Sequence, residues 1–239
     1  MKVANKIPTS SNCIDKYLEG GITPETITLI YGEPETGKTT LAMQCTANCA
    51  MQGLKTLFID CDNTFYPQRL SQISGGKFDE VAERIILMKP KNFAEQTVIV
   101  DHLADYIAKN FGLVVIDTLN SLYRAQVAET AGKGKSAKTF TLNRELNRQM
   151  AVIAQTAKIQ HIPIVVTSQV KSVFNETYVA VAPVATRVME FWADTAIALK
   201  PTENSTIIEA VLKQNRNTQE ATCYLRITQT GIHDYNSRY

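Results

Sequence analysis

The chain has 239 residues, 44% of them hydrophobic, which is enough for one substantial domain with its own core. Its 25 basic and 23 acidic side chains leave a net charge of +2, so no global field draws it to nucleic acid and any DNA site must be a local patch. No segment is apolar for long enough to cross a bilayer, so we expect a soluble cytoplasmic protein with no membrane partner.

Short β-branched runs alternate with longer segments of helical periodicity along the first two thirds of the chain. This pattern predicts an α/β fold, with a mostly parallel sheet covered by helices on both faces. The predicted strands are mostly apolar, as strands buried on both faces should be, and they span Ile27–Tyr31, Thr56–Asp60, Ile85–Met88, Leu113–Asp117 and Ile162–Ser168.

A long helix is predicted between Thr139 and Gln160. Its apolar residues recur at helical spacing and should pack as one stripe, which consists of Leu142, Leu146, Met150, Ile153 and Ala157. Two other stretches, Ala125–Lys138 and Lys171–Arg187, show weak periodicity and each begins just after a predicted strand end. We expect both to be irregular and to lie at the edge where ligands bind in open α/β sheets.

The last part of the chain changes character after Asp194. Three β-rich runs are separated there by polar turns around Asn204 and Asn217. They predict an antiparallel extension of the same sheet, with strands at Thr195–Leu199, Thr206–Lys213 and Thr222–Thr228.

A phosphate-binding motif follows the first predicted strand. Residues 32–39 read GEPETGKT and fit G-x-x-x-x-G-K-[ST], with a predicted helix after them. The glycines let backbone N–H groups converge on phosphate oxygens, the lysine supplies positive charge, and the threonine hydroxyl is a magnesium ligand. We therefore expect ATP and Mg²⁺ to be held by Gly32, Glu33, Pro34, Glu35, Thr36, Gly37, Lys38, Thr39 and Thr40.

The second half of such a site is an acidic residue that ends a buried strand. Residues 111–117 read FGLVVID, so Asp117 is expected beside the magnesium together with Thr39. An apolar strand that ends in aspartate also occurs as a plain cap, and it is the pairing with the phosphate-binding motif that favours the metal role.

Further motifs resemble the RecA/RadA family of DNA-repair recombinases. Residues 58–70, FIDCDNTFYPQRL, are similar to the family stretch that reads hydrophobic-I-D-T-E-G-T-F-R-P-E-R. Residues 117–124 resemble its Walker B strand and the start of its first DNA-binding loop. Residues 165–170 resemble the strand that ends in a nucleotide-sensing glutamine, and residues 7–22 resemble the entry to the core.

The resemblance covers essentially the whole chain and is best matched by the RadB family, the short archaeal paralogues. It implies one RecA-like ATPase core over residues 1–239, without the N-terminal helical DNA-binding domain of full-length recombinases. It further implies ATP and DNA binding, weak ATP hydrolysis, no strand exchange, and a nucleoid-associated helper role in recombination. The partners it suggests are single-stranded or branched DNA, the RadA recombinase and the Holliday-junction resolvase, whereas a monomer and a dimer both stay open.

Three residues take catalytic or binding roles from this resemblance. Asp62 occupies the position of the glutamate that activates the attacking water, and because aspartate is one methylene shorter we expect slow turnover. Asp62 could instead be a magnesium partner in the outer shell or a loop cap. Arg69 matches an arginine that stacks on adenine, or is a solvated helix charge, and Gln169 would contact the terminal phosphate, or cap its strand.

The first irregular stretch is basic and predicts a DNA contact. A basic loop gives salt-dependent, sequence-independent affinity, although lysine runs are often merely solvated. The second stretch is poorer in charge, and Pro183-Val184-Ala185 stands where the family usually has a glycine pair. The expected DNA-binding residues are Arg124, Lys133, Lys135, Lys138 and Arg187.

Cysteines and histidines carry no recognisable site. The cysteines lack the CxxC spacing of zinc sites and are odd in number, which argues against a disulfide framework and for a reducing compartment. Cys45 and Cys49 are one helical turn apart and could grip a metal, but we favour two buried thiols. The scattered His102, His161 and His233 are expected to be structural.

Two other classes of function stay open at this point. One is a KaiC-like, RecA-fold signalling ATPase that does not bind DNA. The other is a small-molecule kinase, for which no separate acceptor domain or lid is evident in the sequence. The segment 60–69 and the basic stretch favour the DNA-repair reading over both.

Overall fold

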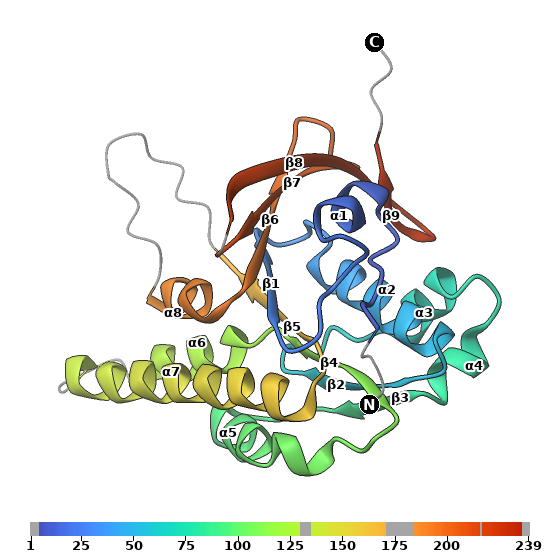
Figure 1. The fold of residues 1–239 in the computed structure, drawn as a ribbon. Helices are drawn as coiled ribbons and strands as arrows, with labels where there is room; N and C mark the ends of the chain where they lie inside the picture. Colours follow the sequence, from blue (N-terminus) through green and yellow to red (C-terminus); the bar gives the residue numbers. More distant parts are fainter. Residues whose placement is uncertain (1–4, 130–134, 171–183, 216, 236–239) are drawn as a thin grey trace.

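In the computed structural model the described residues are 5–129, 135–170, 184–215 and 217–235. They form a nine-stranded sheet in the order β3-β2-β4-β5-β1-β6-β7-β8-β9 (Figure 1). The strands are β1 Ile27–Gly32, β2 Lys55–Asp60, β3 Ile85–Met88, β4 Phe111–Asp117, β5 Ile164–Gln169, β6 Thr195–Pro201, β7 Ile207–Gln214, β8 Asn217–Thr228 and β9 Gly231–Asp234. Pairing is parallel from β3 to β6 and antiparallel from β6 to β9.

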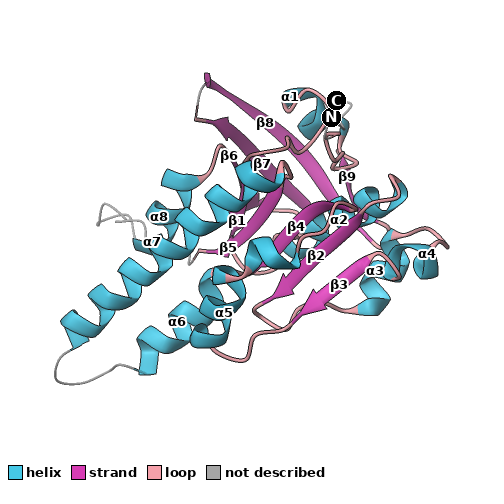
Figure 2. Cartoon of the chain, turned by 60° about the horizontal axis from the view of Figure 1, so that its bottom comes forward, coloured by secondary structure: helices cyan, strands magenta, loops and turns pink. Residues whose placement is uncertain are grey.

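Helices cover both faces of the sheet (Figure 2). On one side lie α1 Asn12–Tyr17, α2 Lys38–Met51, α3 Pro67–Ile73 and α4 Phe78–Ala82. On the other lie α5 Phe93–Asp101, the short 3-10 helix Leu103–Tyr106, α6 Asn120–Glu129, α7 Lys135–Gln160 and α8 Val184–Trp192. None of the described helices is long and apolar enough to cross a membrane.

Alternation along each strand divides the core in two. Val115 and Val165 face α2, whereas their neighbours Val114 and Ile164 face α7, and all four are fully buried. The α/β fold, the parallel sheet and its antiparallel C-terminal extension are thus confirmed. The stripe predicted on the long helix is also confirmed, since Leu146, Met150, Ile153 and Ala157 are buried and Leu142 is half-buried.

Several local expectations were wrong. The strand β3 is an edge strand, so Ile86 and Leu87 are each 39% exposed and not buried on both faces. The strand β6 runs parallel to β1, and the antiparallel part begins only at β7. Helices occupy residues 125–129, 135–138 and 184–187 of the stretches expected to be irregular, while 130–134 and 171–183 lie outside the described residues.

One pair of cysteines departs from expectation and another follows it. Cys13 and Cys223 form a disulfide that joins α1 to β8 across 210 positions. The Cα atoms of Cys13 and Cys223 lie 6.0 Å apart, a distance that a disulfide can span. An odd number of cysteines does not show which of them the fold brings together. Cys45 and Cys49 are buried free thiols, as expected, and burial raises the pKa of Cys49 to about 11.

The histidines have ordinary polar partners on the surface. His102 pairs with Asp105 at 3.1 Å, His161 pairs with Glu25 at 2.7 Å, and His233 lies 3.0 Å from the Thr230 hydroxyl. Within the described ranges, no group of three or more His, Cys, Asp or Glu residues is arranged to hold a metal ion.

Candidate nucleotide and DNA site

The sequence-predicted site residues come together because four neighbouring strands end at one edge of the sheet. In the order β2-β4-β5-β1, Asp60 pairs with Asp117 and Gly32 pairs with Gln169. By alternation, Asp117 and Gln169 project to the same face as Val115 and Val165, the face on which α2 packs. The edge therefore gathers the carboxylates of Asp60 and Asp117, the Gln169 amide and the turn that leads into α2.

The turn between β1 and α2 needs both of its glycines. A Cβ on Gly32 would lie 2.2 Å from the Leu199 carbonyl oxygen and 2.9 Å from the Thr36 hydroxyl. Gly37 has φ +85°, and a Cβ there would lie 2.8 Å from Ile232 Cδ1. Only residues without a Cβ fit at these two positions, so the two glycines allow the tight turn that leads into α2. At the start of this helix, backbone N–H groups are available to bind an anion.

Lys38 is buried at the start of α2. Burial lowers the pKa of its ammonium to about 8, against the opposing effect of Asp117, Asp62 and Glu33. Its Nζ donates to the Glu33 carbonyl oxygen at 2.5 Å and lies 3.5 Å from the Thr36 hydroxyl. A buried cation that contacts carbonyl and hydroxyl oxygens and forms no ion pair with a described carboxylate is suited to bind phosphate.

Asp117 is fully buried at the end of β4. Burial raises the pKa of its carboxyl, and hydrogen bonds from Thr167, Thr39 and Thr64 oppose this shift. The Thr64 hydroxyl lies 3.2 Å from Oδ2, and Thr167 donates to Oδ1. Hydroxyl and carboxylate oxygens are the ligands Mg²⁺ prefers, so the contact between Thr39 and Asp117 fits the metal pair predicted from the sequence.

Asp60 is a structural anchor that the motif comparison did not single out. Its carboxylate accepts the backbone N–H groups of Thr64 at 2.9 Å and Phe65 at 3.1 Å, and it forms an ion pair with Lys89 at 3.3 Å. The Lys89 ammonium also donates to Asn63. Asp60 thus holds the turn that carries Asp62. Its place at the end of an apolar strand was the available signal.

The first turn of α6 contacts two of the predicted catalytic residues. The Ser121 hydroxyl donates to Asp62 Oδ1 at 2.6 Å, while Asp62 itself is exposed. Asn120 bonds the backbone of Gln169 on both sides, accepting from its N–H at 3.2 Å and donating to its carbonyl at 3.1 Å. Neither Ser121 nor Asn120 was expected to have a role, because their partners lie 59 and 49 positions away in the sequence.

Arg69 lies on α3 against the β8–β9 turn. Its guanidinium donates to the carbonyl oxygens of Thr228 at 2.8 Å and Gln229 at 2.7 Å, and to the Gln72 side chain at 3.1 Å. Burial lowers its pKa. This arginine fastens α3 to the C-terminal strands, a role that neither sequence-based alternative included.

Four of the five expected DNA-binding residues lie on three helices. Arg124 on α6 lines a hollow of 560 Å³ together with Asp62, Ser121 and Gln169. Lys138 on α7 and Arg187 on α8 are exposed. Lys135 begins α7, and Lys133 lies outside the described residues. Among the expected DNA-binding residues whose side chains the structure describes, Arg124 is the one that shares a hollow with Asp62 and Gln169.

A parallel sheet with a G-x-x-x-x-G-K-[ST] turn after β1 and an aspartate at the end of β4 defines a RecA-type P-loop protein. Residues 2–235 match the Rad51 family. A similar fold occurs in a solved structure titled "Crystal structure of the RadB recombinase", with a TM-score of 0.78, 30% identity, and coverage of 96% of this chain and 100% of that one.

Curated relatives of similar length carry the name "DNA repair and recombination protein RadB". The protein of Methanococcus maripaludis strain C5 is 30% identical, with 95% of this chain and 99% of the relative covered. The relative from Methanothermobacter thermautotrophicus is 32% identical, and the alignment covers 95% of this chain and 95% of the relative. The relative from Thermococcus kodakarensis is 31% identical, and the alignment covers 95% of this chain and 99% of the relative. The chain belongs to the Rad51 family and, within it, to the RadB DNA repair and recombination proteins.

Proposed function

We propose that the chain binds ATP with Mg²⁺ at the carboxyl ends of β1, β4 and β5, and acts on DNA as an accessory protein of recombination. The observation that carries this proposal is that the candidate nucleotide-binding residues lie next to one another at one edge of the sheet. The strand order β4-β5-β1 brings Asp117, Gln169 and the turn before α2 to one edge and one face. Ligands of open α/β sheets bind at that edge.

Each residue of the edge has a distinct part in this proposal. Backbone N–H groups of residues 32–39 and the Lys38 ammonium hold the phosphates, and Thr39 and Asp117 hold the metal. Bound Mg²⁺ neutralises charge that develops on the phosphate oxygens. Gln169 contacts the terminal phosphate and, through the backbone bonds of Asn120, is linked to α6.

Hydrolysis is proposed to be slow because Asp62 is a poorly placed base. One of its oxygens already accepts the Ser121 hydroxyl at 2.6 Å, and aspartate reaches less far than the glutamate of related recombinases. Asp62→Glu should therefore raise the hydrolysis rate. If turnover by this variant stays at the wild-type level in a phosphate-release assay, reach is not the limiting factor.

DNA contact is proposed for the surface that begins at α6. Arg124 shares a hollow with Asp62 and Gln169, so a strand bound there would lie beside the nucleotide edge. The exposed Lys138 and Arg187 extend the basic surface along α7 and α8, and Lys133 and Lys135 complete the predicted set. Lysine and arginine bind the phosphate backbone by releasing counterions, which makes affinity fall with salt.

The testing experiment is fluorescence anisotropy of labelled single-stranded DNA over a salt series, with ATP and Mg²⁺, with ADP, and without nucleotide. The test variant carries Lys133→Ala, Lys135→Ala and Lys138→Ala. We expect wild-type affinity to fall with salt and to depend on nucleotide. In the variant, the slope of log affinity against log salt should shrink by about 2, since each phosphate contact contributes roughly 0.7.

A charge-matched control separates local contact from net charge. Lys109, Lys158 and Lys200 are exposed and stand outside the proposed surface, so their replacement by alanine removes the same charge. This control should bind DNA as the wild type does. An equal loss of DNA affinity in both variants would show that net charge alone causes the effect. If the wild type binds no DNA in any nucleotide state, the result would favour a KaiC-like signalling ATPase.

The proposal also includes partners and domain organisation. We propose RadA-type recombinases and the Holliday-junction resolvase as protein partners, tested by co-purification of the full chain with each in the presence of ATP. One continuous sheet supports a single RecA-like core as the unit that acts in these complexes.

A further inference from the structure

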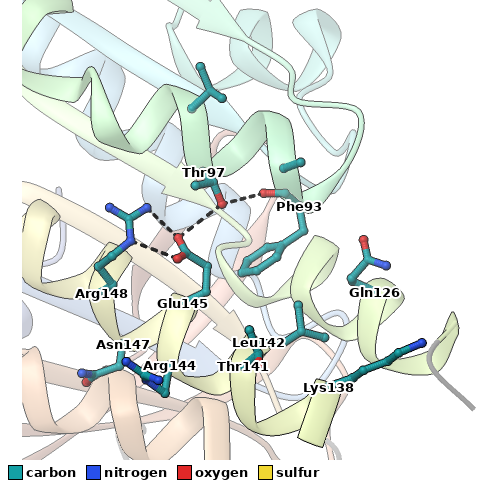
Figure 3. Close-up of a pocket in the computed structure, with 12 residues that line it drawn as sticks. Phe93, Thr97, Gln126, Lys138, Thr141, Leu142, Arg144, Glu145, Asn147 and Arg148 are labelled. Atoms are coloured by element: carbon teal, nitrogen blue, oxygen red, sulfur yellow. Dashed lines mark hydrogen bonds and ion pairs between the residues drawn. The ribbon is translucent and has the colours of Figure 1, made fainter. Parts of the chain in front are cut away.

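A broad groove runs between α5, α6 and α7, on the sheet face opposite α2 (Figure 3). It has a volume of about 1190 Å³, which exceeds the range of roughly 300 to 1,000 Å³ typical of small-molecule sites. Helix α5 forms one wall, and the N-terminal half of α7 forms the other. The groove therefore has room for a segment of another polypeptide.

The floor of the groove is apolar. The Phe93 ring points toward Leu142 across the space between α5 and α7 (Figure 3). Ala94 and Val98, one and five positions further along α5, also line the groove. Val98 is 56% exposed and Ala94 is exposed, although both belong to a helix that packs on the core. A contiguous apolar surface of this kind marks an interaction site more often than an isolated exposed side chain does.

Some of the charged side chains around the floor form ion pairs and others do not. Arg148 is paired with Glu145 at 2.7 Å and with Asp101 at 2.6 Å, so this end of the groove is neutralised. Lys138 and Arg144 on the same helix are exposed and form no ion pair with any described residue. The unpaired charge on the α7 wall is positive.

We propose that this groove docks an acidic amphipathic helix of a partner protein. Apolar side chains at helical spacing would lie over Phe93, Val98 and Leu142, and carboxylates on the flank would meet Lys138 and Arg144. Helix-in-groove binding of this type places the affinity in a few buried anchors, and the charges set the orientation and exclude basic segments.

Nucleic acid is a poor occupant of the apolar floor of this groove, although Lys138 at its rim also belongs to the proposed DNA surface. Single strands bind where exposed aromatic rings offer stacking faces, whereas the Phe93 ring is buried and the exposed part of the floor is aliphatic. The groove also lies across the sheet from α2 and its phosphate-binding turn. A docked helix would therefore leave the nucleotide edge open, and its binding should be independent of ATP.

The probes for a test are two synthetic helical peptides of about 16 residues, roughly 24 Å long, with the same leucine face. One carries glutamates on its polar face and the other lysines. Each is labelled with fluorescein and titrated with the full chain without nucleotide or DNA. We expect the acidic peptide to bind and the basic peptide to bind about tenfold more weakly or not at all.

Two variants and one control locate the binding. Val98→Glu should weaken the acidic peptide about tenfold by placing a charge on the floor. Ile159→Glu is a matched control, since Ile159 is 58% exposed on α7 but does not line the groove, and it should bind the peptide as the wild type does. The double variant Lys138→Glu with Arg144→Glu should transfer the preference to the basic peptide.

Three results would overturn the proposal. The first is equal binding of both peptides, or of neither. The second is acidic-peptide binding that survives Val98→Glu or is lost in Ile159→Glu, provided far-UV circular dichroism shows each variant to be folded. The third is a wild-type dimer in sedimentation that Val98→Glu converts to a monomer, because the groove would then be filled by a second copy of the chain.

Discussion

The two faces of the sheet are closed by different means. On the α2 face, Gln44 donates to the carbonyl oxygens of Thr9 at 3.2 Å and Ile232 at 3.0 Å and accepts from the Ile232 N–H, and the disulfide adds a covalent tie. On the α7 face, side-chain bonds join neighbouring helices, with Gln149 bonded to Gln96 at 2.9 Å and Arg148 bonded to Asp101 at 2.6 Å, and no disulfide joins the described residues of this face. The face with the proposed nucleotide edge is thus tied to the terminal segments of the chain by buried polar bonds and a disulfide, whereas the other face is tied helix to helix and keeps a groove between α5, α6 and α7.

The largest effect is expected from Gly32→Ala. The new Cβ would meet the Leu199 carbonyl oxygen at 2.2 Å, so the turn must open and its N–H groups would no longer converge. We expect ATP affinity to fall about a thousandfold, or about 4 kcal/mol, in calorimetric titration. Leu142→Ala on the opposite face should leave ATP affinity unchanged. Tight ATP binding by folded Gly32→Ala protein would show that the turn is not the phosphate site.

The covalent tie of the α2 face gives the next effect. Cys13→Ser should lower the free energy of unfolding by about 3 to 4 kcal/mol in oxidising buffer, because the disulfide restricts a long loop of the unfolded chain. Denaturant unfolding with and without dithiothreitol measures this difference. In reducing buffer the two proteins should unfold alike. Equal stability in oxidising buffer would mean that the bond does not form in solution.

On the α7 face, Leu146→Ala should cost stability without affecting the nucleotide. Leu146 is fully buried against the sheet, so its truncation should lower the free energy of unfolding by about 3 kcal/mol. ATP affinity of the folded variant should stay at the wild-type value. Leu41→Ala, equally buried on α2, should lose similar stability and also bind ATP more weakly. If both variants bind ATP equally well, the two faces are not functionally distinct.

The smallest effect is expected where α6 meets the nucleotide edge. Ser121→Ala should free Asp62 Oδ1 and change kcat about fivefold, or about 1 kcal/mol, with little change in KM. Ser121→Thr keeps the hydroxyl and should restore the wild-type rate. An equal change of kcat in both variants would indicate that the bond to Asp62 has no part in turnover.

Sequence reasoning succeeded where a feature is local. The β-branched runs located the parallel strands, and the G-x-x-x-x-G-K-[ST] spacing with the aspartate after residue 116 pointed to two segments that the fold brings to one edge of the sheet, where we propose the nucleotide site. The short β9 was missed because four residues, Gly231–Asp234, carry too little periodicity to separate from a turn.

It failed where the answer depends on distant neighbours. Ile86 and Leu87 look like core residues until the strand order puts β3 at an edge. Cys13 and Cys223 meet only because α1 and β8 pack together. Polar contacts such as the one between Ser121 and Asp62 likewise join segments whose spacing in the sequence gives no signal.

The disulfide between Cys13 and Cys223 also keeps the chain in one covalent piece after a single backbone cut between them. It closes nearly the whole chain into a covalent ring, since the two sulfurs belong to residues 210 positions apart. A single cut in the backbone at any point inside that ring opens it without releasing a fragment. Protein cut once in this way would migrate as one species on a non-reducing gel, and a reducing agent would separate the two fragments.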